Sequence, residues 1–421
     1  MSRALDVYLH DQKAGVLEQA DDARLAFTYD SDYLAGDGLP ISISMPTREE
    51  AYDDPIARPY FSGLLPDERA RRRLASALGV SHENAFGLLE IIGGECAGAL
   101  SLIRQGQSLP DPSVGSPEPL DGRRLAELIA LLRERPLLGG EQGVRLSLAG
   151  AQDKLAVCVV DGEITLPRDG RPTTHILKPF IEGLEGTVEN EVFCMMLARR
   201  VGLEAPAVAK GGAGKTDFFL IERYDRITDS NGQISKLHQE DFCQALSVPP
   251  ELKYEEEGGP GVARSLELIQ SATQRPAAER LRFQRMLIFH YLVGNADAHA
   301  KNYALLYGHR SPDLAPLYDV VCTAAYPRLS QSLAMKIGGR SIPDTIHLEH
   351  WHALVPSTQA ARRLLAAELA RMASTIEAEA DQLLEELRER DIWHPILRTV
   401  RKIIGTRAAL ILRVLEKAAG Q

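Results

Sequence analysis

A cluster of polar side chains interrupts an apolar stretch in the second half of the chain. The sequence LVGNADAHAKNYALL places Asp297 and Asn302 with four residues between them. Polar groups among buried segments cost free energy unless they are paired, so such a cluster indicates a functional role. In phosphotransferases this D-x-x-x-x-N spacing presents a carboxylate to the substrate hydroxyl and an amide oxygen to Mg²⁺. The spacing therefore predicts a general base and a metal ligand, although a capping aspartate and a turn asparagine would give the same pattern.

A second carboxylate follows this cluster. Asp319 lies in APLYDVV, after the strand-like run NYALLY and the turn GHRSPD. A hairpin at that turn would return Asp319 to the side of Asn302, so that the two side chains could share a metal. Mg²⁺ prefers hard oxygen ligands and keeps several waters, so a carboxylate, an amide and the nucleotide phosphates form a sufficient set.

Residues upstream could hold a nucleotide. Lys178 ends the strand-like run HILK, and Glu191 follows on a predicted helix, where its carboxylate could hold the lysine toward the phosphates. Glu189 on the same helix is the competing candidate. The run FFLIERYDR, an apolar strand that breaks into charge, predicts a hinge at Glu222 and Tyr224 whose backbone would hydrogen-bond adenine.

A loop of small residues precedes Lys178. The segment SLAGAQDK opens into a strand, and its backbone N–H groups could cradle phosphate oxygens. The loop consists of Leu148, Ala149, Gly150, Ala151, Gln152 and Asp153. Another glycine-rich segment, AKGGAGKTD, contains Lys210 and Lys215 but lacks the G-x-x-x-x-G-K-[ST] spacing, so we predict a hairpin there.

The composition limits the class of protein. The chain has 421 residues, of which 44% are hydrophobic and 25% charged, as expected for a soluble globular protein of two or three domains. A net charge of −10 argues against a chain that coats nucleic acid or an anionic membrane by itself. The five scattered cysteines, without a CxxC pair, predict reduced core residues. No export signal and no long apolar run is found, so we expect a cytoplasmic protein.

Four regions follow from the sequence pattern. Alternation around Leu5 and in ARLAFTYD predicts a β-rich module over residues 1–105, with helices at PDERARRRLASALGV and, after a serine cap, at SHENAFGLLEII. A Pro-, Ser- and Gly-rich linker and one helix occupy residues 106–139. Residues 140–240 read as a small lobe with a sheet and one long helix, and residues 241–421 as an all-helical lobe. The expected class is α+β, with the two lobes of a protein kinase.

Seven segments in order resemble the HipA serine/threonine kinases, the toxins of bacterial toxin–antitoxin modules. They are SLAGAQDK, HILKPF, ENEVFCMMLA, LIERYDR, HQEDFCQAL, GNADAHAKN and APLYDVV. The resemblance covers essentially the whole chain and implies the HipA fold with ATP and Mg²⁺ as cofactors. It implies that Asp297 is the catalytic base, that Asn302 and Asp319 bind Mg²⁺, and that Lys178 contacts the phosphates. The remaining nucleotide contacts that it implies are Glu222 and Tyr224 at the hinge and Gln239, His299 and Tyr318 around the nucleotide.

The same resemblance implies partners and a switch. Members of this family pair with a HipB antitoxin, a dimeric helix-turn-helix repressor that carries the kinase onto operator DNA. Their substrates are translation factors, notably aminoacyl-tRNA synthetases, whose phosphorylation arrests growth. Ser147 would be autophosphorylated, and the added charge would disfavour the closed phosphate loop unless a basic group such as Arg145 received it. Alternatively, Ser147 only caps the neighbouring strand.

Two other functions fit parts of the sequence. His290, Asp297, His299 and Asp319 could form a metal-dependent phosphohydrolase site, which would leave Lys178 and the phosphate loop unexplained. A catalytically silent nucleotide-binding corepressor is the second alternative. Ordinary protein kinases have His-Arg-Asp and Asp-Phe-Gly where this chain has Asn295-Ala296-Asp297 and Tyr318-Asp319-Val320, and no segment predicts a regulatory activation loop.

Overall fold

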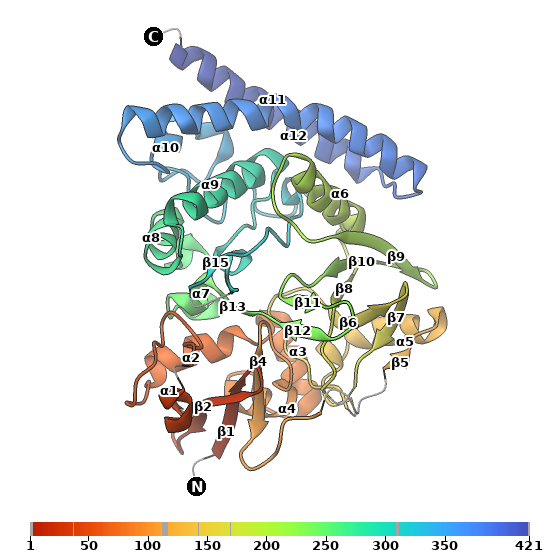
Figure 1. The fold of residues 1–421 in the computed structure, drawn as a ribbon. Helices are drawn as coiled ribbons and strands as arrows, with labels where there is room; N and C mark the ends of the chain where they lie inside the picture. The colour runs from red at the N-terminus through yellow and green to blue at the C-terminus, as the bar shows by residue number, and fades with distance from the viewer. Residues whose placement is uncertain are drawn as a thin grey trace. The chain divides into compact units, whose positions relative to one another are not determined.

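The protein divides into two compact units (Figure 1). The computed structural model describes residues 3–36, 38–111, 117–141, 143–168, 170–308 and 311–419. One unit, here called the sheet unit, consists of Met1–Pro179, Gly211–Leu252 and Ala304–Asp313. The other, the helical unit, consists of Phe180–Lys210, Lys253–Tyr303 and Leu314–Gln421. The domain boundaries expected after residues 105, 139 and 240 remain predictions.

The sheet unit begins with a four-stranded antiparallel sheet of order β3-β2-β1-β4. Its strands are β1 (Arg3–Leu9), β2 (Gln12–Gln19), β3 (Leu25–Tyr29) and β4 (Leu100–Arg104). Leu5, Val7 and Leu9 are buried, as the alternating pattern predicts for one face of a strand. The helices of this region are α1 (Ser31–Ala35), α2 (Asp54–Gly63), α3 (Glu68–Leu78) and α4 (Ala85–Ile92).

The sequence predicts how α3 ends and how α4 begins, and the structure can be compared with both predictions. The C-terminal signal of α3 is confirmed, because Gly79 adopts the left-handed conformation with φ of 68°. The serine cap predicted for α4 is wrong. Asn84 stands directly before the helix, and its side chain accepts a hydrogen bond from the N–H of Gly87 at 3.0 Å. Asn84 therefore supplies the acceptor that the first turn of the helix needs.

A second sheet has six strands in the order β5-β7-β6-β8-β10-β9. They are β5 (Glu118–Pro119), β6 (Leu155–Val160), β7 (Glu163–Leu166), β8 (His175–Pro179), β9 (Val208–Ala213) and β10 (Thr216–Glu222), of which β9 crosses the boundary between the units. Gly214, with φ of 62°, lies in the turn between β9 and β10, so the predicted hairpin is confirmed. Before this sheet lie α5 (Gly122–Leu132) and the 3₁₀ turn η1 (Pro136–Leu138).

The rest of the sheet unit consists of short elements. β11 (Arg226–Thr228) pairs with β12 (Ile234–Lys236), and β13 (His238–Asp241) pairs with β14 (Ala304–Tyr307). α7 (Phe242–Ala245) and η2 (Pro250–Leu252) follow β13. A single hydrophobic core extends from Leu5 to Phe218 and joins the N-terminal sheet to the six-stranded sheet.

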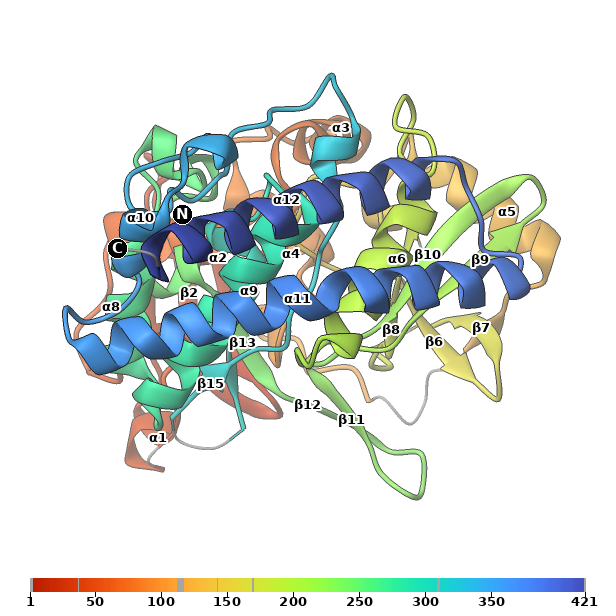
Figure 2. The same cartoon turned by 90° about the horizontal axis from the view of Figure 1, so that it is seen from above.

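The helical unit consists mainly of helices joined by irregular segments. The helices are α6 (Thr187–Arg200), α8 (Val262–Ala272), α9 (Pro276–Val293), α10 (Leu348–His352), α11 (Gln359–Glu389) and α12 (Ile396–Ala419). Short turns are η3 (Glu255–Glu257), η4 (Ala300–Asn302), η5 (Thr323–Ala325) and η6 (Pro343–Thr345), and β15 (Asp313–Leu314) lies at a unit boundary. Figure 2 shows α11 and α12 side by side along their length.

Two further expectations were drawn from composition. All five cysteines are buried and none forms a disulfide, which confirms their prediction as core residues. Within the described ranges, no helix has the length and apolar character needed to cross a membrane.

Candidate active site

The segment that follows α9 presents one exposed carboxylate. α9 ends at Gly294, whose φ of 74° reverses the chain at once. Asp297 is exposed, whereas the residues on both sides of it are buried. Asn295 holds the turn by accepting a hydrogen bond from the Asp297 N–H at 3.0 Å, and its amide lies 3.1 Å from the ring of His290. The segment 294–302 is here called the catalytic loop. Its buried residues hold the backbone, and Asp297 is left accessible to a ligand.

Asn302 closes this loop. Its side-chain amide donates to the backbone carbonyl of Asp297 at 3.1 Å, and the residue itself is buried. Because the nitrogen is used in this bond, the oxygen is the end of the amide that remains to ligate a cation. The Tyr318 hydroxyl donates to the carbonyl of Lys301 at 2.8 Å, which fixes the segment before Asp319 beside the loop.

Asp319 has an unusual backbone conformation. Its φ of 58° lies in the left-handed region, which residues other than glycine adopt rarely. Such conformations cluster at functional sites because the surrounding structure must hold them. Burial lowers the pKa of the nearby His290 to about 3, against the opposing effect of the Asp319 carboxylate, so the imidazole is neutral.

The donor atoms present favour a hard cation with few protein ligands. Among the residues that the structure describes, no group of three or more histidine, cysteine, aspartate or glutamate side chains could hold a metal ion. The phosphohydrolase alternative depends on such a group, formed by His290, Asp297, His299 and Asp319. An amide oxygen and a carboxylate, supplied by Asn302 and Asp319, fit Mg²⁺ that is otherwise bound by water and phosphates.

Tyr254 contacts the catalytic loop and was not predicted as a site residue. Its hydroxyl donates to Oδ1 of Asp297 at 2.8 Å. Its ring meets that of His299 edge to face, with the centroids 5.1 Å apart. The only signal for this residue in the sequence is its place in KYEEEGGPG, where the glycines predict a tight turn.

The two acidic candidates on α6 differ in their surroundings. Glu189 forms an ion pair with Lys210 at 2.6 Å. Glu191 is 2% exposed and lies two residues nearer the middle of the helix. Between them, Asn190 binds the backbone of Cys322 through both ends of its amide, which fixes the orientation of α6 within the helical unit. Glu189 thus has a cationic partner within its own unit, and the choice of Glu191 to hold Lys178 stays a prediction.

Lys178 lies in the six-stranded sheet as predicted from the run HILK. It is on β8, opposite Phe219 on β10, and its ammonium lies 5.5 Å from the centre of the Phe219 ring. The side chain is buried. Gln152 of the phosphate loop donates to the carbonyl of Pro179 at 2.9 Å, so the loop is tied to the strand that carries the lysine.

One of the two predicted hinge residues, Tyr224, lies against Gln239. Tyr224 donates its hydroxyl to Oε1 of Gln239, and the Gln239 amide donates to Asp225 at 3.1 Å. Glu222 ends β10 opposite His175. The structure thus brings Tyr224 and Gln239, which are separate in sequence, into one hydrogen-bonded pair.

A buried ionic network supports this pair. Asp225 binds Arg223 at 2.7 Å and Arg226 at 3.0 Å, and Arg226 binds Glu95 at 2.8 Å. Burial by itself would raise the pKa of the Glu95 carboxyl, but the neighbouring arginines and Lys236 outweigh it and lower the pKa to about 2. The acids are therefore ionised, and the network rigidly positions the backbone on either side of Tyr224.

The phosphate loop is held by the N-terminal region of the same unit. Gly150, with φ of 109°, forms an isolated bridge with Pro66 and accepts a hydrogen bond from the Asp67 N–H at 3.1 Å. Arg73 on α3 binds both carboxylate oxygens of Asp153, one of them at 3.2 Å. Inside the loop, Lys154 donates to the carbonyl of Ala149. The side chain of a residue other than glycine at position 150 would collide with the Lys154 ammonium.

Ser147 is fully buried at the start of this loop. Its exposed fraction is 0%, its hydroxyl donates to the carbonyl of Leu64 at 2.7 Å, and its N–H donates to the carbonyl of Glu95 at 2.8 Å. Arg145 donates to the carbonyls of Glu90, Ile91 and Leu102. In this conformation Nε and Nη2 of Arg145 bind backbone carbonyls, and the expectation that Arg145 receives a phosphate on Ser147 stays a prediction.

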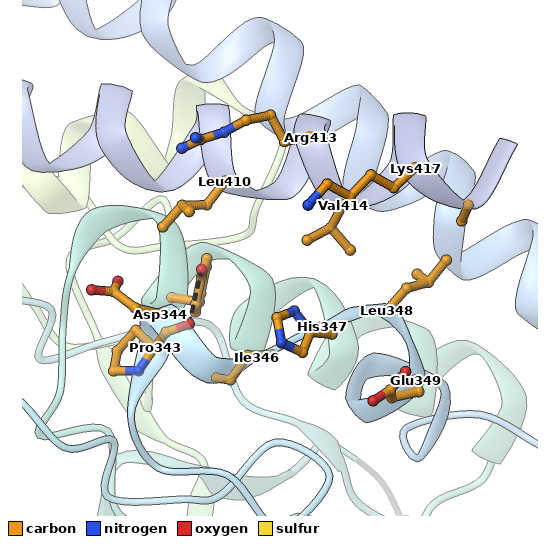
Figure 3. Close-up of a pocket in the computed structure, with 12 residues that line it drawn as sticks. Pro343, Asp344, Ile346, His347, Leu348, Glu349, Leu410, Arg413, Val414 and Lys417 are labelled. Carbon is orange, nitrogen blue, oxygen red and sulfur yellow. Dashed lines mark hydrogen bonds between the residues drawn. The ribbon is translucent and has the colours of Figure 1, made fainter. Parts of the chain in front are cut away.

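A separate cavity lies in the helical unit (Figure 3). It measures about 300 Å³ and lies between α12 and the segment from η6 to α10. Leu410 and Val414 contribute apolar walls, with His347 opposite them. None of the predicted site residues lines it.

Comparisons with known proteins identify the same family in both halves of the chain. Residues 5–103 match the model of the HipA N-terminal domain, and residues 146–386 match that of the HipA-like C-terminal domain. The Sinorhizobium fredii protein named "Putative kinase Y4mE" is 44% identical over 356 residues, which cover 83% of this chain and 84% of that protein. The "Serine/threonine-protein kinase toxin HipA" of Shewanella oneidensis is 28% identical over 384 residues, covering 88% and 87% of the two chains.

A solved structure is similar over nearly the full length. It is the Shewanella oneidensis MR-1 complex of HipA, HipB and operator DNA, one chain of which is 25% identical with a TM-score of 0.84 and 98% coverage of both chains. The α+β, kinase-like fold expected from the sequence is therefore confirmed.

Proposed function

This chain belongs to the HipA family of serine/threonine kinase toxins, and we propose that it transfers the γ-phosphate of ATP to a serine or threonine hydroxyl of another protein. The observation that carries the proposal is the catalytic loop, in which the one exposed carboxylate, Asp297, is linked through its backbone carbonyl to the amide of Asn302. A base and a metal ligand joined in this way are the arrangement that phosphotransfer needs.

The proposed step assigns a role to each side chain. Asp297 accepts the proton of the substrate hydroxyl as the oxygen bonds to the γ-phosphorus and the bond to ADP breaks. Asn302 and Asp319 would hold Mg²⁺, which offsets the negative charge of the phosphates when bound. Lys178 contacts the phosphates, and Glu191 holds the lysine in that direction.

The nucleotide is proposed to bind through both backbone and side chains. The N–H groups from Leu148 to Asp153 would cradle phosphate oxygens. Glu222 and Tyr224 would meet the adenine at the hinge, and the hydrogen bond between Tyr224 and Gln239 supports a common role for these two residues. His299 and Tyr318 are the remaining proposed nucleotide contacts.

Autophosphorylation of Ser147 is proposed to switch the enzyme off. Because the hydroxyl is buried against the carbonyl of Leu64, the loop must leave its site before phosphate can be added. The phosphate carries about −1.5 to −2 charges at neutral pH. The buried site would remove it from water and place it beside a carbonyl oxygen, so the phosphorylated serine would not return to that site. The modified loop would therefore stay away from the position in which it cradles ATP.

The proposed partners follow from the relatives. The similar Shewanella structure contains HipA, HipB and operator DNA. A HipB-like antitoxin dimer is therefore proposed as partner and corepressor, with DNA bound mainly through the antitoxin, because this chain carries a net charge of −10. The proposed substrate is a translation factor such as an aminoacyl-tRNA synthetase.

The test compares purified wild type with Asp297→Asn and with Asp344→Asn, which removes an exposed acid elsewhere in the helical unit. Wild type and Asp344→Asn should transfer labelled γ-phosphate in the presence of Mg²⁺, whereas Asp297→Asn should be at least about 10²-fold slower. Phosphoproteomics after brief expression of wild type and Asp297→Asn would identify the substrate. ATP binding without any transfer by the wild type would favour the silent corepressor instead.

A further inference from the structure

The segment that begins at Lys253 lies against the catalytic loop, and its role does not follow from the sequence motifs. The N–H of Ala300 donates to the carbonyl of Lys253 at 3.3 Å, so the two backbones lie side by side. From this position Tyr254 reaches two side chains of the loop, those of Asp297 and His299. Its hydroxyl donates to Oδ1 of Asp297 at 2.8 Å, and its ring packs edge-on against His299.

The turn that follows Tyr254 is anchored to a third segment. The N–H of Glu255 donates to the carbonyl of Ala334 at 3.3 Å, and the Glu255 carboxylate accepts from the N–H of Lys336 at 2.6 Å. Ala334 in turn donates its N–H to the carbonyl of Ala296, next to the base, at 2.8 Å. Tyr254, the 334–336 segment and the catalytic loop are therefore linked by backbone bonds.

A glycine keeps this turn compact. A Cβ atom at position 261 would lie 2.4 Å from the Glu255 carboxyl carbon, so only glycine fits without displacing that side chain. The anchoring matters because a tyrosine on a mobile loop would lose conformational entropy each time it bound the base. Here the phenol is already in place.

An exposed carboxylate acts as a general base only when its side chain is held in the right orientation. Unless it is held, such a side chain samples several rotamers, and proton transfer requires it within about 2.6–3.2 Å of the hydroxyl. A carboxylate can accept about four hydrogen bonds, so a single donor orients it without exhausting its capacity to accept the substrate proton. A hydrogen bond to a charged group is also stronger than a neutral one.

We propose that Tyr254 is a positioning residue for phosphotransfer, which holds the carboxylate of Asp297 in the orientation that accepts the proton of the substrate hydroxyl. The inference rests on the kinase activity proposed above. In the step, the substrate O–H bond breaks as the bond to phosphorus forms, the proton passes to Asp297, and Tyr254 keeps its own proton. Because Tyr254 acts through the base, its hydroxyl should affect kcat and leave the affinity for nucleotide unchanged.

The experiment compares full-length wild type, Tyr254→Phe and Tyr291→Phe. Tyr254→Phe keeps the ring against His299 and removes only the hydroxyl. Tyr291→Phe is the matched control, since it removes a tyrosine hydroxyl bound to the carbonyl of Pro343 in the same unit. Self-labelling and casein phosphorylation with labelled ATP give kcat and KM, calorimetry gives the Kd for MgATP, and thermal unfolding reports the fold.

The expected result is a kcat about tenfold lower for Tyr254→Phe, with KM for ATP and Kd for MgATP within about twofold of wild type. Tyr291→Phe should retain the wild-type kcat. An unchanged kcat in Tyr254→Phe beside an active wild type overturns the positioning role alone, as does an increased kcat, which would make Tyr254 a barrier to substrate. A parallel loss of MgATP affinity also overturns it. A wild type that labels neither itself nor casein overturns the proposed function, and the inference falls with it.

Discussion

The amide of Asn302 and the carbonyl of Asp297 are joined by a hydrogen bond of 3.1 Å that spans the 3₁₀ turn η4. One end of a single side chain thereby fixes the backbone of the proposed base, while the other end is left for the proposed metal. One turn thus sets both the position of the proposed base and the position of the proposed cation. A substitution that displaces Asp297 should therefore also displace Asn302, and the reverse should hold.

Replacement of Asp319 should separate its chemical role from its backbone role. Asp319→Asn should lower phosphotransfer at least about 10²-fold, because the carboxylate proposed to bind Mg²⁺ is lost. Asparagine tolerates the left-handed conformation, so this variant should melt like wild type. Asp319→Ala should lose activity and also about 1 kcal/mol of unfolding free energy. Mg²⁺ titrations and thermal melts check both, and a fully active Asp319→Asn would exclude the metal role.

Lys178 should matter for nucleotide use and Lys215 should not. Lys178→Met should reduce ATP-dependent activity at least about 10²-fold, because its proposed contact with the phosphates is lost. Lys215→Met is the control, since Lys215 lies next to Gly214 in the turn between β9 and β10. Phosphate transfer at saturating ATP measures the difference. The opposite outcome, with only Lys215→Met inactive, would move the nucleotide site to the hairpin.

Arg73 should stabilise the phosphate loop from outside it. Arg73→Ala removes the ion pair with Asp153 and should raise KM for ATP about fivefold at unchanged kcat, after allowance for partial exposure of the pair. Arg72→Ala, an exposed neighbour on α3, should have no effect. If the two variants show the same KM, the ion pair does not control the loop.

Ser147 should be the site of self-labelling. Ser147→Ala should lose the label, and it should also lose about 1 kcal/mol of unfolding free energy with its bond to Leu64. Ser147→Asp should bind ATP more weakly, because an ionised side chain does not fit the buried site. Mass spectrometry after incubation with Mg²⁺ and ATP locates the phosphate. Phosphate found only at other residues would remove the proposed switch.

Glu240 should make the stability of the protein depend on pH. Its carboxyl is buried, and burial raises its pKa to about 7, although Ser42, Tyr307 and the N–H of Ile43 donate to it. The folded state therefore binds more protons than the unfolded state above pH of about 4.5, so the unfolding free energy should fall as pH rises from there to about 7. Glu240→Gln should flatten this dependence in urea unfolding at a series of pH values. A slope that persists in the variant would assign it to other groups.

Local signals in the sequence predicted much of the proposed site. The position of Lys178 in a strand depends on residues that are its neighbours in the chain. The same is true of the turn that contains Asn302. It is also true of the hairpin at Gly214, because a glycine with positive φ determines the turn wherever the hairpin packs. These features could be inferred without knowledge of tertiary contacts.

Contacts between distant segments could not be predicted in this way. The bond from Tyr254 to Asp297 joins residues 43 positions apart, and that from Arg73 to Asp153 joins residues 80 apart. The bonds from Arg145 to the carbonyls of Glu90 and Ile91 on α4 and of Leu102 on β4 also join segments that are distant in the sequence. Likewise, the ion pair between Glu189 and Lys210 joins residues 21 positions apart and could not be read from the spacing of the acids on α6.

The unbroken hydrophobic core between Leu5 and Phe218 constrains how this gene can recombine. If a crossover near codon 105 joined the first part of one relative to the remainder of another, it would bring together inward-facing side chains that were not selected to pack. Mismatched volumes in a close-packed interior cost about 1–3 kcal/mol each, which is a large share of the stability of a typical domain. Viable chimeras should therefore exchange the N-terminal sheet together with β6, β8 and β10, so the first hundred codons are inherited with the six-stranded sheet and do not shuffle as an independent module.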